Sequence, residues 1–158
     1  MSRRRPRRAE LIGQVTRALR NMTGQLTRLN QTVASGVGLA VGDLGILELA
    51  DRVGPLTPSR LAELGGLSPA TMTGVLDRLE ADGWIRRERD PDDRRKVNIT
   101  AVGRHRLVQR YYSGMQRRVH QICAGYTDDQ LDLIVEFLTR VAEAGVAATL
   151  DLQAHVGG

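Results

Sequence analysis

The sequence predicts a mainly α-helical fold of the α+β class: a central domain of short helices and one β-hairpin, with longer helices on both sides. Three observations support this prediction. Two helix-start signals, each a Ser or Thr followed by Pro, occur close together in residues 57–69. A strand-like segment begins near residue 84, and a charged loop follows at residues 90–96. Apolar residues recur every three or four positions through both ends of the chain, which is the spacing of amphipathic helices.

The first short helix is predicted to begin at Pro58 and to end at Gly65-Gly66. Thr57 supplies a hydroxyl that can accept a hydrogen bond from a free amide of the first turn, and the fixed φ of Pro58 suits that turn. Glycine enters the left-handed conformation without steric cost, so the glycine pair ends the helix.

The second short helix is predicted over Pro69–Ala81, and it begins with the same cap-and-proline signal at Ser68. Because so short a turn forces the two helices to cross steeply, the pair forms a helix-turn-helix. One face of the second helix carries apolar residues at helical spacing, which we expect in the core. These residues are Met72, Val75, Leu76 and Leu79.

The opposite face of this helix is predicted to meet duplex DNA, because its side chains are small or polar. Threonine can donate, accept or offer its methyl group to thymine, whereas arginine suits phosphate or guanine. We therefore expect Thr71 and Thr73 to read the major groove and Arg78 to anchor a phosphate. Gly74 costs roughly 1 kcal/mol against alanine in a helix, which indicates a close approach, a packing need or simple tolerance. The residues expected at the DNA are Ser68, Ala70, Thr71, Thr73, Gly74 and Arg78.

The hairpin is predicted from a strand over residues 84–89, a polar loop and a second strand over residues 97–100. Cations at its tip suit insertion into a narrow, negative minor groove. Aspartates lie beside them at positions 90, 92 and 93, and we expect at least one to buttress an arginine by a charge-assisted hydrogen bond. The hairpin residues expected at the DNA interface are Asp93, Arg94, Arg95 and Lys96.

The segments on both sides of this domain are predicted to be helical. Apolar residues from Leu11 to Val33 follow helical spacing until residues 35–38 break the pattern, and a further helix spans residues 43–52. After the hairpin, the same pattern returns from Val108 to Ile122. Thr127 then caps a last helix that continues to about residue 152.

These segments together resemble the MarR family of bacterial transcriptional regulators, with a clear match over residues 39–103. The resemblance implies a winged helix-turn-helix in a homodimer that binds a short palindrome and usually represses. A small molecule or an oxidant commonly releases such a protein from DNA. The matching motifs are the Leu-Thr-Pro-Ser…Leu-Ala helix, the Leu-Ser-Pro-Ala-Thr-Met-Thr helix, the Asp-Arg-Leu-Glu…Asp-Gly turn and the Asp-Pro-Asp-Asp-Arg-Arg wing.

The sequence and the resemblance together predict how the chain is divided. Residues 1–8, which contain five arginines, are expected to be a disordered basic arm that either contacts phosphates or is a solvated tail. Residues 9–38 would be an N-terminal dimerisation helix, residues 39–103 the winged DNA-binding domain and residues 104–158 the C-terminal dimerisation helices. An intramolecular bundle is the alternative for the terminal helices.

Two departures from the family pattern leave a second function class open. Gly74 stands where an arginine or another long polar residue is common, and the strand after the wing is about two residues shorter than the pattern leads us to expect. The alternative is therefore a winged-helix protein-interaction module without specific DNA binding. The wing cations argue against it. The family's Asp-x-Arg wing signature maps onto Asp93 and Arg95, and Arg94 is a close rival for the groove-inserting side chain.

Effectors of the family, often aromatic acids, bind in a cleft between the winged domain and the dimerisation helices. Arg17, Arg20 or Arg28 could meet a carboxylate there, with Tyr111 or Tyr112 as a wall. A solvated helix face explains the same arginines equally well, so the sequence assigns no effector residues.

Composition supports a nucleic-acid partner and a shared core. The chain has 158 residues, a net charge of +5 and a pI of about 10.3, which suits a polyanion. The excess of positive charge lies in the first two thirds, since residues 111–158 carry three basic and six acidic side chains. Aromatic residues make up only 3%, so the core must be aliphatic, which favours a dimer that shares a core between its chains.

Several other classes find no support in the sequence. A single cysteine excludes an internal disulfide, and no catalytic constellation, cofactor motif or set of metal ligands is present. His120 and Cys123 alone are too few for a metal site. No run approaches the roughly 20 apolar residues of a membrane span, so we expect a cytoplasmic protein without a membrane partner.

Overall fold

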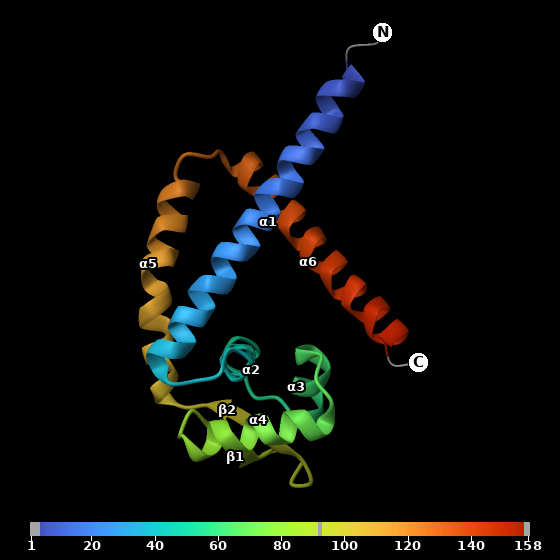
Figure 1. The fold of residues 1–158 in the computed structure, drawn as a ribbon. Helices are drawn as coiled ribbons and strands as arrows, with labels where there is room; N and C mark the ends of the chain where they lie inside the picture. Colours follow the sequence, from blue (N-terminus) through green and yellow to red (C-terminus); the bar gives the residue numbers. More distant parts are fainter. Residues whose placement is uncertain (1–3, 92, 157–158) are drawn as a thin grey trace. The chain divides into compact units, whose positions relative to one another are not determined.

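The computed structural model describes residues 4–91 and 93–156 as a mostly helical chain with one two-stranded sheet (Figure 1). This arrangement confirms the predicted fold class. Two compact units form, the first ending at Tyr112 and the second beginning at Ser113. The elements are α1 (Arg4–Val37), α2 (Val41–Val53), α3 (Pro58–Gly65), α4 (Pro69–Ala81), β1 (Ile85–Arg89), β2 (Val97–Ala101), the 3₁₀ turn η1 (Gly103–His105), α5 (Arg106–Cys123) and α6 (Asp128–Val156).

Helix α1 begins earlier than the sequence suggested. It starts at Arg4, so residues 4–8 of the expected disordered arm are helical, while residues 1–3 of that arm lie outside the described residues. Arginine is a good helix former, and Pro6 falls in the first turn, where no helical partner exists for a backbone N–H. The helix also runs through the expected break and ends at Val37, where Gly38 adopts a φ of 77°.

The predicted starts of the two short helices are confirmed. Thr57 Oγ1 accepts the backbone N–H of Arg60 at 3.3 Å, and Ser68 Oγ accepts that of Thr71 at 3.2 Å. Gly66 ends α3 with a left-handed φ of 64°. Because these signals act within a few residues, the observed bounds of α4 coincide with the predicted ones.

The hairpin is antiparallel and regular, with Arg87 paired to Ile99 at its centre. Strand β2 has five residues, one more than the sequence predicted, and pairs with β1 along its whole length. Leu56 adds a bridge to Ile99, which joins the hairpin to the segment before α3. Strand β1 starts at Ile85, one residue later than predicted, because the backbone N–H of Trp84 donates to the Leu79 carbonyl at the end of α4.

A single hydrophobic core fills the space between the helices and the hairpin of the first unit. The four residues predicted for the inner face of α4 are all buried in it. Trp84, Leu44 and Leu61 are among its largest fully buried side chains. Helix α1 contributes Val33 and Ala34 at its C-terminal end, and α5 contributes Val108. This core positions the exposed face of α4 and the hairpin.

The start of α5 is joined to α1 within the same unit. The Tyr112 hydroxyl donates to Asn30 Oδ1 at 2.8 Å, and burial, together with Glu48, raises the pKa of Tyr112 above its usual value. The Tyr111 hydroxyl donates to the Gly36 carbonyl at 3.4 Å. The first turns of α5 therefore belong to the winged unit.

Helix α6 of the second unit begins with a reciprocal cap. The backbone N–H of Gln130 donates to Thr127 Oγ1 at 3.4 Å, and Gln130 Oε1 accepts the N–H of Thr127 at 3.0 Å, which confirms the predicted cap. Across residues 4–91 and 93–156, no single helix is long and apolar enough to cross a membrane; α1 and α2, bent by 92°, meet that test only as a pair, by length and composition.

Candidate nucleic-acid interface

Helix α4 exposes the residues that the sequence assigned to the major groove. Ala70, Thr71 and Thr73 are exposed, and Gly74 is half-buried on the same helix. Ser68 caps the helix at its N-terminal end. Five of the six residues predicted to contact DNA in this region therefore lie on α4 and the sixth is its cap, while the apolar residues of the helix face the core.

The hydroxyl groups on this face already have partners within the helix. Ser68 Oγ and Thr71 Oγ1 lie 2.9 Å apart, and Thr73 Oγ1 donates to the Pro69 carbonyl at 3.0 Å. Each threonine still offers acceptor lone pairs and a methyl group to a base edge. Thr71 and Thr73 thus present a mixed polar and apolar surface.

Arg78, which the sequence assigned to a phosphate, forms an ion pair within the chain. Its Nε and Nη2 donate to the two carboxylate oxygens of Asp43 on α2, at 2.9 and 2.8 Å. Asp43 is buried, with 5% of its surface exposed, whereas the Arg78 side chain is 59% exposed. The hydrogen bond to Asp43, followed by its charge, raises the pKa of Arg78, so the guanidinium stays cationic.

A second ion-pair cluster lies between α4 and the hairpin. Arg87 of β1 donates from Nη2 to Asp77 at 2.6 Å and from Nη1 to Glu80, and its backbone N–H also donates to Glu80. The sequence analysis missed Arg87; the available signal was a pair of acids three residues apart on α4 facing a strand rich in arginine. Helix α4 is therefore attached through charged side chains both to α2 and to β1.

The hairpin tip is shaped by aspartate side chains. Asp90 accepts the backbone N–H of Asp93 at 2.9 Å and the Asn98 amide at 2.7 Å. Asp93 in turn accepts the backbone N–H of Arg95 at 3.1 Å and lies 3.7 Å from Lys96 Nζ. Asp93 thus supports the arginine through its backbone rather than through its guanidinium, while position 92 lies outside the described residues.

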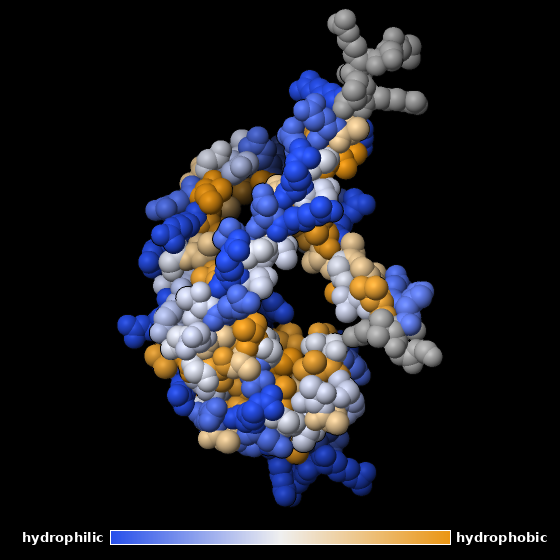
Figure 2. Space-filling view, in the orientation of Figure 1, coloured by the Kyte–Doolittle hydropathy of each residue, from blue (hydrophilic) through white to orange (hydrophobic). Residues whose placement is uncertain are grey.

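Arg94, Arg95 and Lys96 are exposed at this tip. Figure 2 shows the hairpin tip as a hydrophilic projection at the lower edge of the view. Arg94 and Arg95 both belong to this tip, and the minor-groove role and the choice between the two side chains stay predictions.

Comparison with known proteins places the chain among DNA-binding regulators. A family model described as "MarR family" matches residues 41–97, which run from α2 to the start of β2. The HTH-type transcriptional regulator YcgE of Bacillus subtilis strain 168 is 31% identical over 139 residues, which cover 86% of this chain and 89% of YcgE. The HTH-type transcriptional repressor YetL of the same organism is 30% identical over 125 residues, covering 77% and 74%.

Solved structures share the same fold. The crystal structure of Streptococcus pneumoniae FabT in complex with DNA aligns with a TM-score of 0.63 at 20% identity, covering 84% of this chain and 95% of FabT. At this level of identity the likeness concerns the fold, and it includes the helix-turn-helix and hairpin described above.

Proposed function

Because this chain belongs to the MarR family of HTH-type transcriptional regulators, we propose that it acts as a homodimeric repressor that binds a short palindromic DNA site and is released by a small-molecule effector. The family consists of DNA-binding regulators rather than enzymes, and this chain is one of them. A regulator of this kind meets its DNA in the cytoplasm, which remains our expectation for this chain.

The observation that carries the proposal is the pairing of an exposed, small and polar α4 face with a cationic hairpin tip. A recognition helix enters the major groove with its N-terminal residues at the base edges. In the proposed complex, Thr71 and Thr73, with Ala70, face bases, and Arg78 meets a phosphate. Arg94 or Arg95 enters the adjacent minor groove, where a narrow groove concentrates negative potential.

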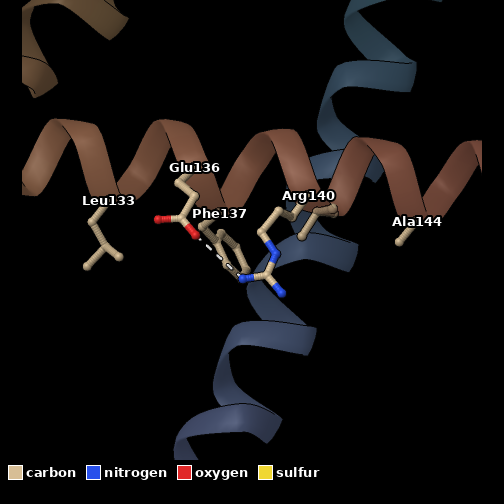
Figure 3. A pocket seen from close by; sticks show the side chains of 6 residues that line it. Leu133, Glu136, Phe137, Arg140 and Ala144 are labelled. Atoms are coloured by element: carbon tan, nitrogen blue, oxygen red, sulfur yellow. Dashed lines mark hydrogen bonds and ion pairs between the residues drawn. The ribbon is translucent and has the colours of Figure 1, made fainter.

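The apolar surface of α6 supports the homodimer. Figure 3 shows a hollow on this helix that is lined by Leu133, Phe137 and Ala144. Glu136 and Arg140, which form an ion pair at 3.5 Å, line it as well. In the single chain, Leu133 has 66% of its surface exposed and Phe137 has 41%. Large apolar side chains that are exposed together often mark an interaction site, and a second copy of the chain would cover these.

Two-fold symmetry then sets the form of the DNA site. Two copies of α4 related by a two-fold axis read inverted half-sites, whose centres lie about one helical turn, roughly 34 Å, apart. The repressor role follows the name of YetL and the family's usual behaviour. A palindrome of this spacing that overlaps a promoter would support both points.

The effector is proposed to be an aromatic acid. In the first unit, a shallow hollow is lined by Leu107, Arg110 and Tyr111, which combine apolar surface, a guanidinium and a phenol. These groups suit a ring that carries a carboxylate. Arg17, Arg20 and Arg28 are exposed along α1 and receive no role in this proposal.

Fluorescence anisotropy with the purified protein tests the DNA proposal. The labelled probe is the DNA upstream of its own gene, the control is an unrelated duplex, and both are titrated across a salt series. We expect tight binding to the upstream fragment, with affinity that falls steeply as salt rises. Equal, salt-sensitive binding to both duplexes would overturn the specific regulator and favour the protein-interaction module.

The wing assignment is tested in the same assay. Arg95→Ala is expected to weaken binding and leave the dimer intact in sedimentation. If Arg94→Ala weakens binding instead, the groove-inserting role passes to Arg94.

A further inference from the structure

Among the residues that the structure describes, Asp43 is the single charged residue in the buried class, with 5% of its surface exposed. It lies in the first turn of α2. A buried carboxylate is strongly disfavoured unless it is paired and hydrogen-bonded. Its position therefore depends on the group that it binds.

That group is the guanidinium of Arg78, 35 positions later in the chain. Both carboxylate oxygens of Asp43 accept from it, one from Nε at 2.9 Å and one from Nη2 at 2.8 Å. A guanidinium bound through two parallel hydrogen bonds has a fixed plane and direction. The Arg78 side chain is nevertheless 59% exposed. Asp43 therefore fixes the orientation of a guanidinium that solvent can reach.

Gly74 indicates where the third nitrogen of Arg78 lies. A Cβ atom added at Gly74 would lie 3.5 Å from Arg78 Nη1, and this is its closest neighbour outside the helix backbone. Nη1, which Asp43 does not engage, therefore lies over the Gly74 backbone, on the exposed part of α4. The absence of a side chain at Gly74 leaves open space beside this nitrogen.

We propose that Asp43 is a positioning residue for DNA binding: it holds the Arg78 guanidinium beside Gly74, so that Nη1 is presented to a backbone phosphate of the operator. The inference rests on the proposed function, since it requires α4 to lie against specific DNA. It assigns a role to Asp43, which does not touch the DNA.

The expected sign of the effect separates this role from simple charge repulsion. Asp43 is negative, so Coulomb's law alone predicts that its removal strengthens binding to a polyanion. If Asp43 orients Arg78, removing its charge releases a side chain that must then be ordered at the interface. Binding then weakens by about three- to tenfold.

The test uses full-length protein and a duplex that the protein itself selects from a random pool. Kd is measured by anisotropy for Asp43→Asn, Arg78→Met and the double variant, on the selected duplex and on a random one. Asp43→Asn is expected to weaken binding to the selected duplex, and to have no further effect once Arg78 is Met. A structural role alone would lower the melting temperature and leave the Kd of the folded protein unchanged.

Two further variants keep the outcome decisive. Asp82→Asn changes the net charge equally at the exposed C-cap of α4, and we expect its Kd to be unchanged or lower. Arg78→Lys keeps a cation beside Asp43, but lysine cannot form the two parallel hydrogen bonds that fix the guanidinium. This variant should therefore bind the selected duplex as weakly as Asp43→Asn does. It decides the question if Asp43→Asn does not fold.

The proposal fails if Asp43→Asn or, where that variant does not fold, Arg78→Lys binds the selected duplex at least as tightly as the native protein. It also fails if the Asp43→Asn effect persists undiminished in the Arg78→Met background. Failure to enrich any sequence from the pool would instead contradict the proposed function itself. The two failures are therefore distinguishable.

Discussion

The winged region and the second unit use their apolar side chains in opposite ways. Residues 39–103 bury theirs against one another, and Leu61, Leu79 and Ile99 have no exposed surface. In α6, by contrast, Leu133, Leu152 and other large aliphatic residues are exposed by 60% or more. No described side chain of α6 is buried.

The difference indicates that the two regions gain stability from different partners. Apolar burial is the main favourable contribution to folding, and the winged region obtains it within one chain. The second unit leaves its apolar side chains exposed, in keeping with the proposed homodimer. Substitutions of similar size should therefore unfold one region and change the assembly of the other.

The largest effect is expected where the winged core is opened. Leu79→Ala removes a side chain with no exposed surface and should lower the free energy of unfolding by about 2–5 kcal/mol. Urea denaturation followed by circular dichroism measures this loss. Leu64→Ala on α3, where the leucine is 45% exposed, is the control and should cost much less. Equal losses would contradict the assignment of the core to this face.

The next largest effect is expected on the association of the second unit through α6. Phe137→Glu places a charge in the α6 hollow and forgoes the roughly 1.5–3 kcal/mol that burying this ring would contribute per chain. We expect a shift from dimer to monomer in sedimentation equilibrium. The neighbouring Glu136→Gln, which loses only an exposed ion pair, should remain a dimer. An unchanged dimer in Phe137→Glu would move the interface elsewhere.

A smaller effect is expected at the junction of α4 and the hairpin. Arg87→Met removes a partly buried cation from Asp77 and Glu80, and should lower the unfolding free energy by about 1 kcal/mol. DNA affinity should fall with it, because the hairpin loses its attachment to the recognition helix. Arg86→Met, whose partner Glu88 is exposed, is the matched control and should change stability by less than about 0.5 kcal/mol. If the two variants change the unfolding free energy and the DNA affinity equally, the ion pairs of Arg87 do not stabilise the junction of α4 and the hairpin.

The smallest effect on stability is expected at Gly74. Gly74→Ala should raise the unfolding free energy by up to about 1 kcal/mol, because alanine is the better helix former. The added Cβ meets Arg78 Nη1 at 3.5 Å, which is ordinary contact. Thermal denaturation measures the gain. A loss of stability would show that the guanidinium lies closer to the helix than the structure places it.

Features that depend on neighbouring residues were predictable from the sequence. The caps at Thr57 and Ser68 and the inner face of α4 follow from local spacing, and the structure confirms them. The ion pair of Asp43 and Arg78 joins residues 35 positions apart, and no local pattern encodes such a contact. Arg87 was missed for the same reason, since its acidic partners lie on a different element.

The start of α1 was missed for another reason. A run of arginines is compatible both with a solvated tail and with a helix, because arginine has a high helix propensity. Only the connection to a long helix selects between them. In the described residues the helix begins at Arg4.

One consequence of α1 concerns the transmission of motion. Its C-terminal end is fixed in the winged core through Val33 and Ala34, each only 1% exposed, while its 34 residues extend for about 51 Å at 1.5 Å per residue. A stiff rod held at one end acts as a lever. A rotation of about 5° at the core would displace the far end by roughly 4 Å over that length. Conversely, a small displacement imposed at the far end of α1 would change the orientation of the winged domain.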